Sequence, residues 1–577
     1  MKKKLLPALI VTGLIILVVI IMGITALINK YTPTKKTEDL KEYFNISSDD
    51  EVALIVDNEL SDYKAKIIDK KIYIDYKFVH DSLNSRFYWD ANENVLLYTT
   101  ASDIISAAAD SNSYSVTKQT NDFGYPIVKA TSDSALIALD YVKQYSNITF
   151  KSYDDPARIV ITSKWDEIDS ATVSKSTQVR VKGGIKSPIL KEVKKDDKIT
   201  ILDSGDKWDK IATEDGVIGY IKGKALSESK KTKLTNPDYE EETFTHIKKD
   251  KDICLAWNQV TSQSANSKVP QVISSTKGIN VMSPTWFYLN DNNGNLADIA
   301  SKDYVSYCHS QGIEVWGLFS NFENTDVDAA YVLTHTSTRT TLINQIMSAA
   351  FNYELDGVNI DFENITEAAY GDSYIEFIRE LAIKCHNNGI SLSVDVTVPA
   401  SFNKFFNRSD MANFADYIVI MGYDEHYKGS DAGSVSSIPW VTEGVESTLK
   451  EVPADQIILG MPFYTRIWEL TPKEDDDAVT DTEDQSKYTV ASQVYSMDAA
   501  AAQLATNNAT AALDEESGQN YAEWSVSNKL YKVWLEDTTS LEKRLKLVDD
   551  NKLAGAAFWK LGFENSSVWD TVIKYLN

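Results

Sequence analysis

The sequence has little cysteine, little histidine and a shortage of positive charge. Its 577 residues include 3 Cys and 6 His. The odd cysteine count in so long a chain excludes a disulfide framework, and the histidines show no metal-ligand spacing. Lys and Arg number 58 against 84 Asp and Glu, a net charge of -26. Such a chain repels a phosphate backbone, so we expect no nucleic-acid partner. No metal, nucleotide or flavin cofactor is implied.

The composition is otherwise that of a folded protein with several domains. A hydrophobic fraction of 43% with 25% charged residues excludes wholesale disorder. At roughly 100–200 residues per domain, the length predicts three or four domains.

One long apolar run without charge, at residues 5–28, follows three lysines at positions 2–4. About 24 residues at 1.5 Å each are enough to cross a hydrocarbon core of about 30 Å. We expect residues 1–30 to form a transmembrane signal-anchor with the lysines in the cytoplasm and the remaining chain outside. The alternative is a cleaved signal peptide, whose apolar region is usually shorter. Ala26 could precede the cut, but Ile24 is bulky for such a site.

Two small modules are expected after a polar tether at residues 31–50. The first, at 51–168, shows strand patterns at 52–56, 71–74, 94–98 and 158–162, with a helical stretch that ends at 86–90. It is predicted to be an α+β module and loosely resembles the N-terminal domain of copper amine oxidases. We assign it no chemistry.

The second module, at 172–228, has four strand patterns separated by turn residues at short intervals, which is typical of a small all-β barrel. The strands at 208–211 and 219–221 resemble those of the bacterial Src-homology-3-type domain. That resemblance implies adhesion to a wall polymer; the alternative is a spacer. A charged linker at 229–245 follows.

Residues 246–577 alternate between strand and helix patterns. Near-continuous apolar strands such as Tyr417–Met421 are typical of a parallel sheet buried on both faces. Eight of them predict a (β/α)8 TIM barrel with its active site at the C-terminal ends of the strands. An insertion at about 469–529 is expected to form a lid or wall over that site. The strands are predicted at 253–259, 279–286, 313–320, 357–363, 391–398, 417–423, 457–463 and 555–562.

The fourth predicted strand carries three polar residues on one face. Asn359, Asp361 and Glu363 alternate with apolar residues, so all three point the same way along the strand. Because the apolar side must face the surrounding helices, the polar side faces into the barrel. Two acids close together in a partly dry site cannot both ionise easily, and the pKa of one of them rises. A carboxylic acid that stays protonated near neutral pH can protonate a leaving oxygen.

This strand resembles that of glycoside hydrolase family 18, the chitinase-like barrel family, whose pattern is D-G-x-D-x-D-x-E. Residues 356–363 read DGVNIDFE here. The resemblance is greatest to the branch of bacterial cell-wall and spore-cortex N-acetylglucosaminidases, and it covers nearly all of residues 246–577. Four further strand ends match that branch, at 283–287, 421–425, 460–466 and 557–559.

The resemblance implies a role for each matching residue. Glu363 corresponds to the general acid/base, and Asp361 to the carboxylate that orients and stabilises the N-acetyl group of the substrate. In this family the nucleophile is the acetamide oxygen of the substrate itself. Tyr423 corresponds to the hydroxyl donor to the acetamide carbonyl. The substrate-binding residues expected are Asn359, Trp559 as the floor of the -1 sugar subsite, Asp424, Tyr464, Arg466 and Trp286.

Asn359 departs from the family pattern, which has an aspartate at that place and two acids that share a proton. Because an amide cannot titrate but can donate a hydrogen bond, we hypothesise that Asn359 donates to an ionised Asp361. Asp361 would then stay charged throughout turnover. On this hypothesis, Asn359→Asp shifts the pH–rate profile.

Together these patterns predict a membrane-anchored glycosidase that hydrolyses β-1,4 bonds of an N-acetylglucosamine-containing glycan. The anchor and the all-β module favour peptidoglycan, and chitin or a host N-glycan also contains the required sugar. The alternatives are a chitinase, or a catalytically silent carbohydrate-binding barrel at the cell wall. The expected location is the bacterial cell membrane, single-pass, with the catalytic domain extracytoplasmic; the alternative is secretion after signal cleavage.

Overall fold

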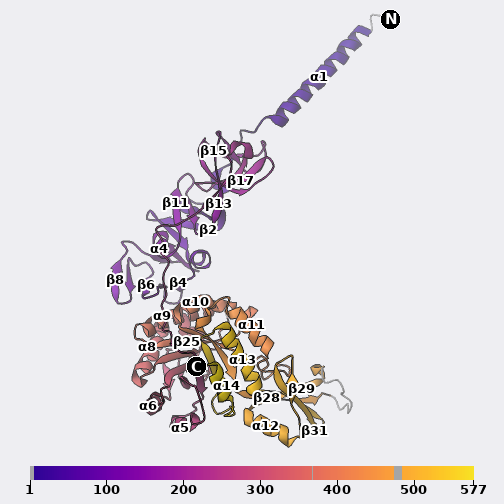
Figure 1. Ribbon diagram of the computed structural model, residues 1–577. Coiled ribbons are helices and arrows are strands. Elements are labelled where there is room, and N and C mark those ends of the chain that lie inside the picture. The colour runs from indigo at the N-terminus through magenta and orange to yellow at the C-terminus, as the bar shows by residue number, and fades with distance from the viewer. Residues whose placement is uncertain (1–4, 367, 474–483, 577) are drawn as a thin grey trace. The chain divides into compact units, whose positions relative to one another are not determined.

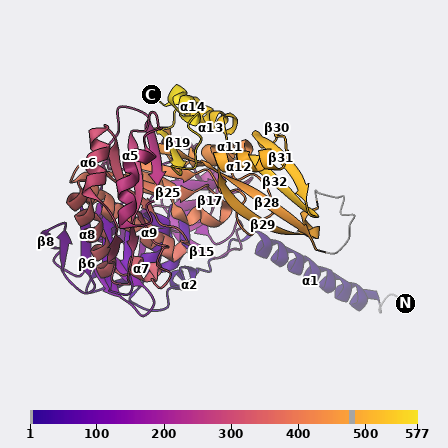
Figure 2. The same ribbon diagram turned by 90° about the horizontal axis from the view of Figure 1, so that it is seen from below.

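The computed structural model describes residues 5–366, 368–473 and 484–576 (Figures 1 and 2). The chain divides into two compact units. The first contains the described residues up to Trp89 together with Ala107–Tyr114 and Thr120–Glu241, and the second contains Asp90–Ser106, Ser115–Gln119 and the residues from Glu242 onward.

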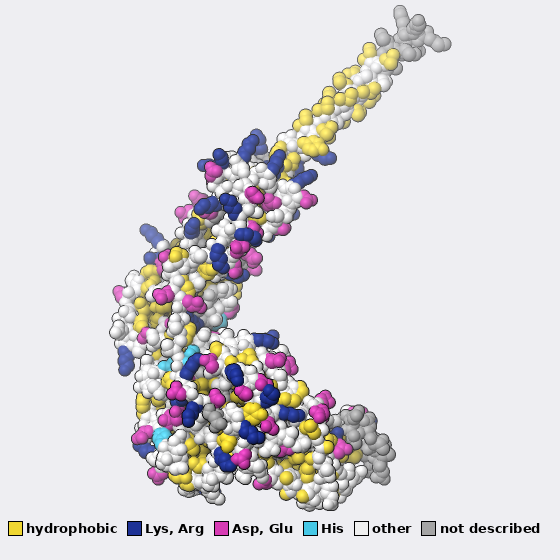
Figure 3. Space-filling model, viewed as in Figure 1, with side chains coloured by type: hydrophobic (Ala, Val, Ile, Leu, Met, Phe, Trp, Pro, Cys, Tyr) yellow, Lys and Arg dark blue, Asp and Glu magenta, His cyan; other side chains and the backbone are white. Residues whose placement is uncertain are grey.

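The first unit begins with α1 (Leu5–Tyr31). Residues 9–31 have a mean hydropathy of 2.9 and none of them is buried, and the hydrophobic side chains follow the whole helix in Figure 3. Among the described residues it is the one helix long and apolar enough to cross a membrane. The three lysines of the predicted anchor lie outside the described residues.

A mixed sheet follows in the first unit, with the strand order β11-β12-β1-β2-β3-β10-β9. Within the described residues, its one parallel pair is formed by β1 (Glu51–Val56) and β12 (Arg158–Thr162). The other bounds are β2 (Glu59–Ile68), β3 (Lys71–Asp75), β9 (Val128–Ala130), β10 (Ala135–Ala138), β11 (Thr149–Tyr153) and the helices α2 (Leu40–Tyr43), α3 (Tyr76–Phe78) and α4 (Leu139–Tyr145).

The helical stretch expected to end at 86–90 is shorter than the sequence suggested. A single π-type turn, Val79–Leu83, follows α3, and Phe87–Asp90 is strand β4. The three consecutive aromatic residues of β4 favour an extended backbone. Four further short strands follow: β5 (Val95–Thr99), β6 (Ile104–Ala108), β7 (Ser113–Val116) and β8 (Gln119–Asp122).

A second, antiparallel sheet of the first unit has the order β15-β14-β18-β17-β16-β13-β19. Its core contains Val179, Ile199, Ile211 and Ile221. The sheet extends beyond the predicted module at 172–228, because the residues just before and just after it form two paired strands at one edge of the sheet. Its strands are β13 (Glu167–Thr172), β14 (Thr177–Arg180), β15 (Ile189–Val193), β16 (Lys198–Asp203), β17 (Trp208–Thr213), β18 (Ile218–Lys222) and β19 (Lys230–Lys233).

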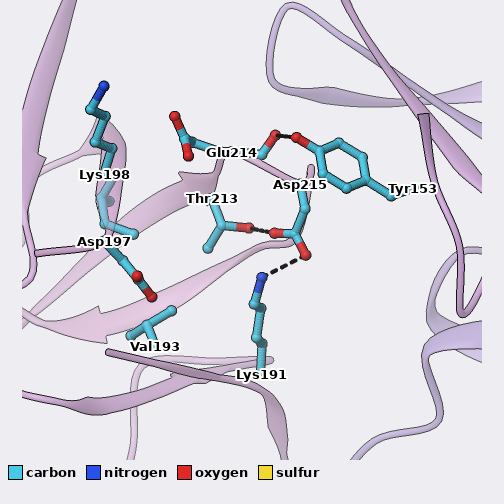
Figure 4. Close-up of a pocket in the computed structure, with 9 residues that line it drawn as sticks. Tyr153, Lys191, Val193, Asp197, Lys198, Thr213, Glu214 and Asp215 are labelled. Carbon is cyan, nitrogen blue, oxygen red and sulfur yellow. Dashed lines mark hydrogen bonds and ion pairs between the residues drawn. The ribbon is translucent and has the colours of Figure 1, made fainter. Parts of the chain in front are cut away.

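A charged pocket of about 280 Å³ lies in the first unit near the end of β17 (Figure 4). Asp215 accepts hydrogen bonds there from Lys191 Nζ at 2.5 Å and Thr213 Oγ1 at 2.5 Å. It also pairs with Arg158 of β12 at 2.6 Å. Burial alone would raise the pKa of Asp215, but these donors lower it overall. Because its partners come from both sheets, Asp215 ties the two sheets of this unit together.

The second unit contains a closed parallel barrel, which confirms the predicted fold. β20 pairs with both β21 and β33, which closes the ring β20-β33-β27-β26-β25-β24-β23-β21. Its strands are β20 (Ile253–Asn258), β21 (Val281–Leu289), β23 (Glu314–Ser320), β24 (Gly357–Asp361), β25 (Ser391–Thr397), β26 (Tyr417–Met421), β27 (Ile457–Pro462) and β33 (Gly555–Trp559), and β22 (Leu296–Asp298) pairs with the outer end of β21.

Helices surround this barrel (Figure 1). The longest are α8 (Thr336–Tyr353), α9 (Ala368–His386) and α13 (Thr538–Asn551). The others are α5 (Val269–Val272), α6 (Lys302–Ser310), α7 (Ala329–Thr334), α10 (Arg408–Phe414), α11 (Ile438–Thr448) and α14 (Val568–Tyr575).

Alternation along the strands divides the hydrophobic residues into two cores. The barrel interior holds Trp257, Trp316 and Tyr417. The layer between the strands and the helices holds the opposite set, including Val358, Ile360 and Phe362 of the fourth strand. The polar side of β24 therefore faces into the barrel, as the alternation predicted.

The long segment after β27 forms an antiparallel sheet beside the barrel, with the order β29-β28-β32-β31-β30 (Figure 2). Part of the predicted insertion at about 469–529 lies outside the described residues, at 474–483. The elements are β28 (Tyr464–Pro472), β29 (Tyr488–Ser496), α12 (Met497–Thr506), β30 (Ala512–Asp514), β31 (Gln519–Val526) and β32 (Lys529–Leu535).

Candidate active site

Glu363 lies two residues beyond the end of β24 and is exposed to solvent. Asn321, which follows β23, holds its backbone from both sides: Asn321 Oδ1 accepts from the Glu363 N–H at 2.9 Å, and Asn321 Nδ2 donates to the Glu363 carbonyl at 2.9 Å. A groove of about 470 Å³ lies beside the side chain, lined by Phe322, Asp328 and Tyr370 among others. The two bonds to Asn321 therefore fix the backbone from which the Glu363 side chain extends beside the groove.

The electrostatic surroundings favour the protonated form of Glu363. The surrounding protein withdraws water from the carboxyl, and this desolvation raises its pKa. The nearby acids Asp424 and Glu323 raise the pKa further. A carboxyl with a raised pKa at the mouth of a barrel suits a general acid.

Asp361 is the last residue of β24 and is 8% exposed. Burial raises its pKa well above the usual range, and the carboxyls of Asp395 and Glu363 raise it further. Its Oδ1 atom is buried without a hydrogen-bond partner among the described residues. Because buried polar atoms in folded proteins nearly always have a partner, this oxygen is a candidate ligand contact.

Asn359 does not donate to Asp361, and this part of the sequence prediction was wrong. Its Nδ2 donates to Asp395 Oδ1 at 2.7 Å and to Ser393 Oγ at 3.1 Å. Its Oδ1 accepts from Trp257 Nε1 at 3.0 Å and Ser283 Oγ at 2.9 Å. Because Asn359 is fully buried and both of its polar atoms are used, it supports the site from below and is not a substrate contact.

Aromatic rings form the inner wall of the barrel mouth. Trp257 of β20 lies edge-on to Tyr423 and Trp559, with ring centroids 6.4 and 6.1 Å apart. Tyr423 and Trp559 are partly exposed above this buried indole. Burial raises the pKa of Tyr423 well above its usual value, so its hydroxyl keeps the proton that a hydrogen-bond donor needs.

Asp424, Tyr464 and Arg466 form a second group at the mouth. Tyr464 donates its hydroxyl hydrogen to Asp424 Oδ1, and Arg466 Nη2 lies 3.8 Å from the same atom. Asp424 is exposed whereas Tyr464 is buried. Tyr464 and Arg466 therefore hold Asp424 in place beside Glu363, and Asp424 is the member of the group that a substrate can reach.

Trp286 does not lie in the mouth, and its predicted substrate contact was wrong. Its side chain is fully buried in the layer between strands and helices, where Nε1 donates to Asn266 Oδ1 at 2.8 Å. The reason is that successive side chains of β21 point to opposite faces of the sheet. Ser283 faces inward to Asn359, so Trp286, three positions later, faces outward.

Sequence reasoning missed three residues of the site. Asp395 on β25 and Trp257 on β20 contact the polar face of β24, and Asn321 holds the backbone of Glu363. Each lies at or just beyond the C-terminal part of a barrel strand. That position was the available signal, since barrel enzymes place their reactive residues there.

Comparisons with known proteins agree with this geometry. The family model for glycosyl hydrolases family 18 matches residues 319–564. The uncharacterized glycosylase YvbX of Bacillus subtilis (strain 168) is 24% identical over 302 residues, which cover 49% of this chain and 81% of the relative. The cortical fragment-lytic enzyme of the same organism is 24% identical over 287 residues, 48% of this chain and 63% of the relative.

The chain thus spans less than two thirds of the length of the second relative. Among solved structures, the spore cortex-lytic enzyme SleL of Bacillus megaterium QM B1551 aligns with a TM-score of 0.48 at 19% identity, over 60% of this chain and 77% of that chain. The family match at residues 319–564 falls on the barrel whose fourth strand presents Asp361 and Glu363, so this part of the chain is similar to glycosyl hydrolases of family 18, and this protein is a glycoside hydrolase.

Proposed function

We propose that this protein is a membrane-anchored glycosidase that cleaves the β-1,4 bond on the reducing side of N-acetylglucosamine in a bacterial wall glycan. The observation that carries the proposal is the pair of acids at the barrel mouth. Glu363 is exposed beside a groove, with a raised pKa. Asp361 lies buried two residues before it, with an unpartnered oxygen.

The reaction follows from this arrangement in two steps. Protonated Glu363 gives its proton to the leaving glycosidic oxygen while the acetamide oxygen of the same sugar attacks the anomeric carbon. The C–O bond to the leaving sugar breaks and an oxazolinium ion forms. Ionised Glu363 then takes a proton from a water molecule as the water oxygen bonds to the anomeric carbon, and the bond from that carbon to the acetamide oxygen breaks. Two displacements on one carbon retain its configuration.

The residues around the two acids fit the demands of an acetamido sugar. A protonated Tyr423 can donate to the acetamide carbonyl and hold its oxygen for attack. Trp559 offers a partly exposed ring, and aromatic rings provide flat apolar contact area with a polar edge. Negative charge near Asp361 stabilises the positive oxazolinium.

Peptidoglycan is the substrate that the remaining features favour. One relative is named a cortical fragment-lytic enzyme, and the apolar α1 would hold the barrel at the membrane beside the wall. The sheet at 167–233, as a Src-homology-3-type module, would add contact with wall polymer. Chitin offers the same sugar at the -1 position, and another relative is named a probable di-N-acetylchitobiase.

Glu363→Gln is the test. Because an amide cannot deliver a proton, the variant should lose release of reducing ends from chitooligosaccharide and peptidoglycan by 10²-fold or more, on the order of a general acid's contribution, and should still bind the glycan. Glu515→Gln, an exposed glutamate in the insertion, is the matched control and should keep full activity. Wild-type protein that binds these glycans but releases no reducing ends would instead establish a silent carbohydrate-binding barrel.

Mass spectrometry of the products distinguishes the substrates. Cleavage of peptidoglycan as proposed leaves N-acetylglucosamine at the new reducing end. Activity on chitin but none on purified peptidoglycan would overturn the substrate assignment and leave the hydrolytic mechanism standing.

A further inference from the structure

We propose that Asp395 is the second acid of the catalytic set: a positioning residue on β25 that shares one proton and one negative charge with Asp361. The inference rests on the proposed function and deepens it. It also reassigns the charge that the sequence alone had placed on Asp361.

The strand register brings the two acids to the same level. β24 and β25 run parallel, with Asn359 opposite Ser393 and Ile360 opposite Val394. One step further along both strands are Asp361 and Asp395. Side chains at the same level of neighbouring parallel strands point to the same face, and the hydrogen bond from Asn359 shows that Asp395 faces into the barrel. Asp395 is 3% exposed.

The orientation of the Asn359 amide is determined by its partners. The indole Nε1 of Trp257 can only donate, so the amide atom 3.0 Å from it must be the oxygen. The NH₂ group then points at Asp395 Oδ1, 2.7 Å away. A carboxylate accepts this bond well, so Asp395 is the member of the pair built to hold a negative charge.

Asp361 has no comparable support. Within the part of the chain that the structure describes, its Oδ1 lacks a hydrogen-bond partner, and no Lys, Arg or His there forms an ion pair with either acid. Burial raises the pKa of both carboxyls, and donation from Asn359 and Trp257 opposes the rise at Asp395. Two buried acids without a cation cannot both ionise. The first charge therefore forms on Asp395 while Asp361 keeps its proton.

The other titratable groups that face Asp395 do not compete for this proton. The charge of Glu363, at the mouth of the barrel, raises the pKa of Asp395. Tyr374 of α9 and Tyr423 at the mouth also face it, and burial, with the nearby acids, raises the pKa of both phenols well above the usual range. Both tyrosines stay neutral, so the Asp361–Asp395 pair sets the charge beneath the sugar.

The test is the pH dependence of kcat/KM on a chitooligosaccharide. In Asp395→Asn only the unsupported Asp361 can supply the charge, so it forms at higher pH. The acid limb of the profile should move to higher pH, and kcat at the wild-type optimum should fall on the order of tenfold or more.

A double variant that moves the carboxyl from position 395 on β25 to position 359 on β24 should restore the activity that the single variant loses. In Asn359→Asp/Asp395→Asn, the new carboxylate keeps the donors Trp257 and Ser283 and gains the amide at 395. The acid limb should return towards wild type. A residue needed only for packing would not produce that return, because the double variant disturbs the core more than the single one.

Two results would overturn the inference: a wild-type acid limb and kcat in Asp395→Asn, or a double variant no better than the single one. Heat-unfolding midpoints check folding, and Asp395→Ser replaces Asp395→Asn if the latter does not fold. Wild type and Glu363→Gln are assayed beside them. An inactive wild type defeats the proposed function, whereas an active wild type with an unchanged Asp395→Asn defeats only the role of Asp395.

Discussion

Trp257→Phe tests whether the hydrogen bonds beneath the acids matter for catalysis. Trp257 is 1% exposed, and its Nε1 donates to Asn359 Oδ1 at 3.0 Å. The substitution removes one hydrogen bond to a buried group, about 1 kcal/mol, and part of a core ring, about 1–2 kcal/mol. The expected loss in the free energy of unfolding is about 2–3 kcal/mol.

The effect on activity should exceed that of a matched tryptophan. Without the indole, Asn359 Oδ1 keeps only Ser283 at 2.9 Å, and the amide can turn away from Asp395. If the lost orientation raises the activation free energy by about 1.4 kcal/mol, kcat falls about tenfold. Trp316 is also fully buried inside the barrel, but its Nε1 donates to Glu314 at the opposite end of the strands.

Trp316→Phe should therefore lower the free energy of unfolding by about 2–3 kcal/mol, for the lost part of the ring and the lost hydrogen bond to Glu314, and leave kcat unchanged. Urea unfolding gives the stabilities, and release of reducing ends gives kcat. The reasoning is refuted if Trp257→Phe keeps kcat within about twofold of wild type, or if Trp316→Phe lowers kcat as much.

Two further predictions follow from charge and hydropathy. Asp424→Asn keeps an acceptor for Tyr464 but removes a negative charge that raises the pKa of Glu363. Because Glu363 acts as an acid only while protonated, the alkaline limb of the kcat/KM profile should move to lower pH. An unmoved limb would contradict the assignment of Glu363 as the general acid. The full chain should sediment with membranes and require detergent for release, whereas a chain that starts at residue 32 should stay in the soluble fraction, since α1 is the apolar segment that would insert. Equal partition of both chains would refute the assignment of α1 as an anchor.

Much of the barrel could be predicted from local pattern alone. The predicted strand at 417–423 lies at Tyr417–Met421, and that at 391–398 lies at Ser391–Thr397. A parallel strand buried on both faces needs an unbroken apolar run, and such a run is visible in the sequence. The inward direction of Asp361 likewise followed from the alternation of polar and apolar residues.

The partners of those residues could not be predicted in the same way. Asn359 lies two residues from Asp361 in the sequence, yet its amide donates to Asp395 on the next strand. Trp286 belongs to a strand end that matched the family, yet the parity of β21 turns its ring outward into the core. Nothing in a local pattern says which of two nearby acids a buried amide will face.

The sequence by itself predicted the succession of barrel strands, the resemblance to glycoside hydrolase family 18 and Glu363 as the candidate proton donor, because periodicity and a short motif depend on the chain's own spacing. The tertiary structure decided which acid the Asn359 amide faces. That choice depends on Trp257, Ser283 and Asp395, which come from three other strands. Closure of the barrel is what brings their polar atoms within hydrogen-bond distance of Asn359, which is fully buried.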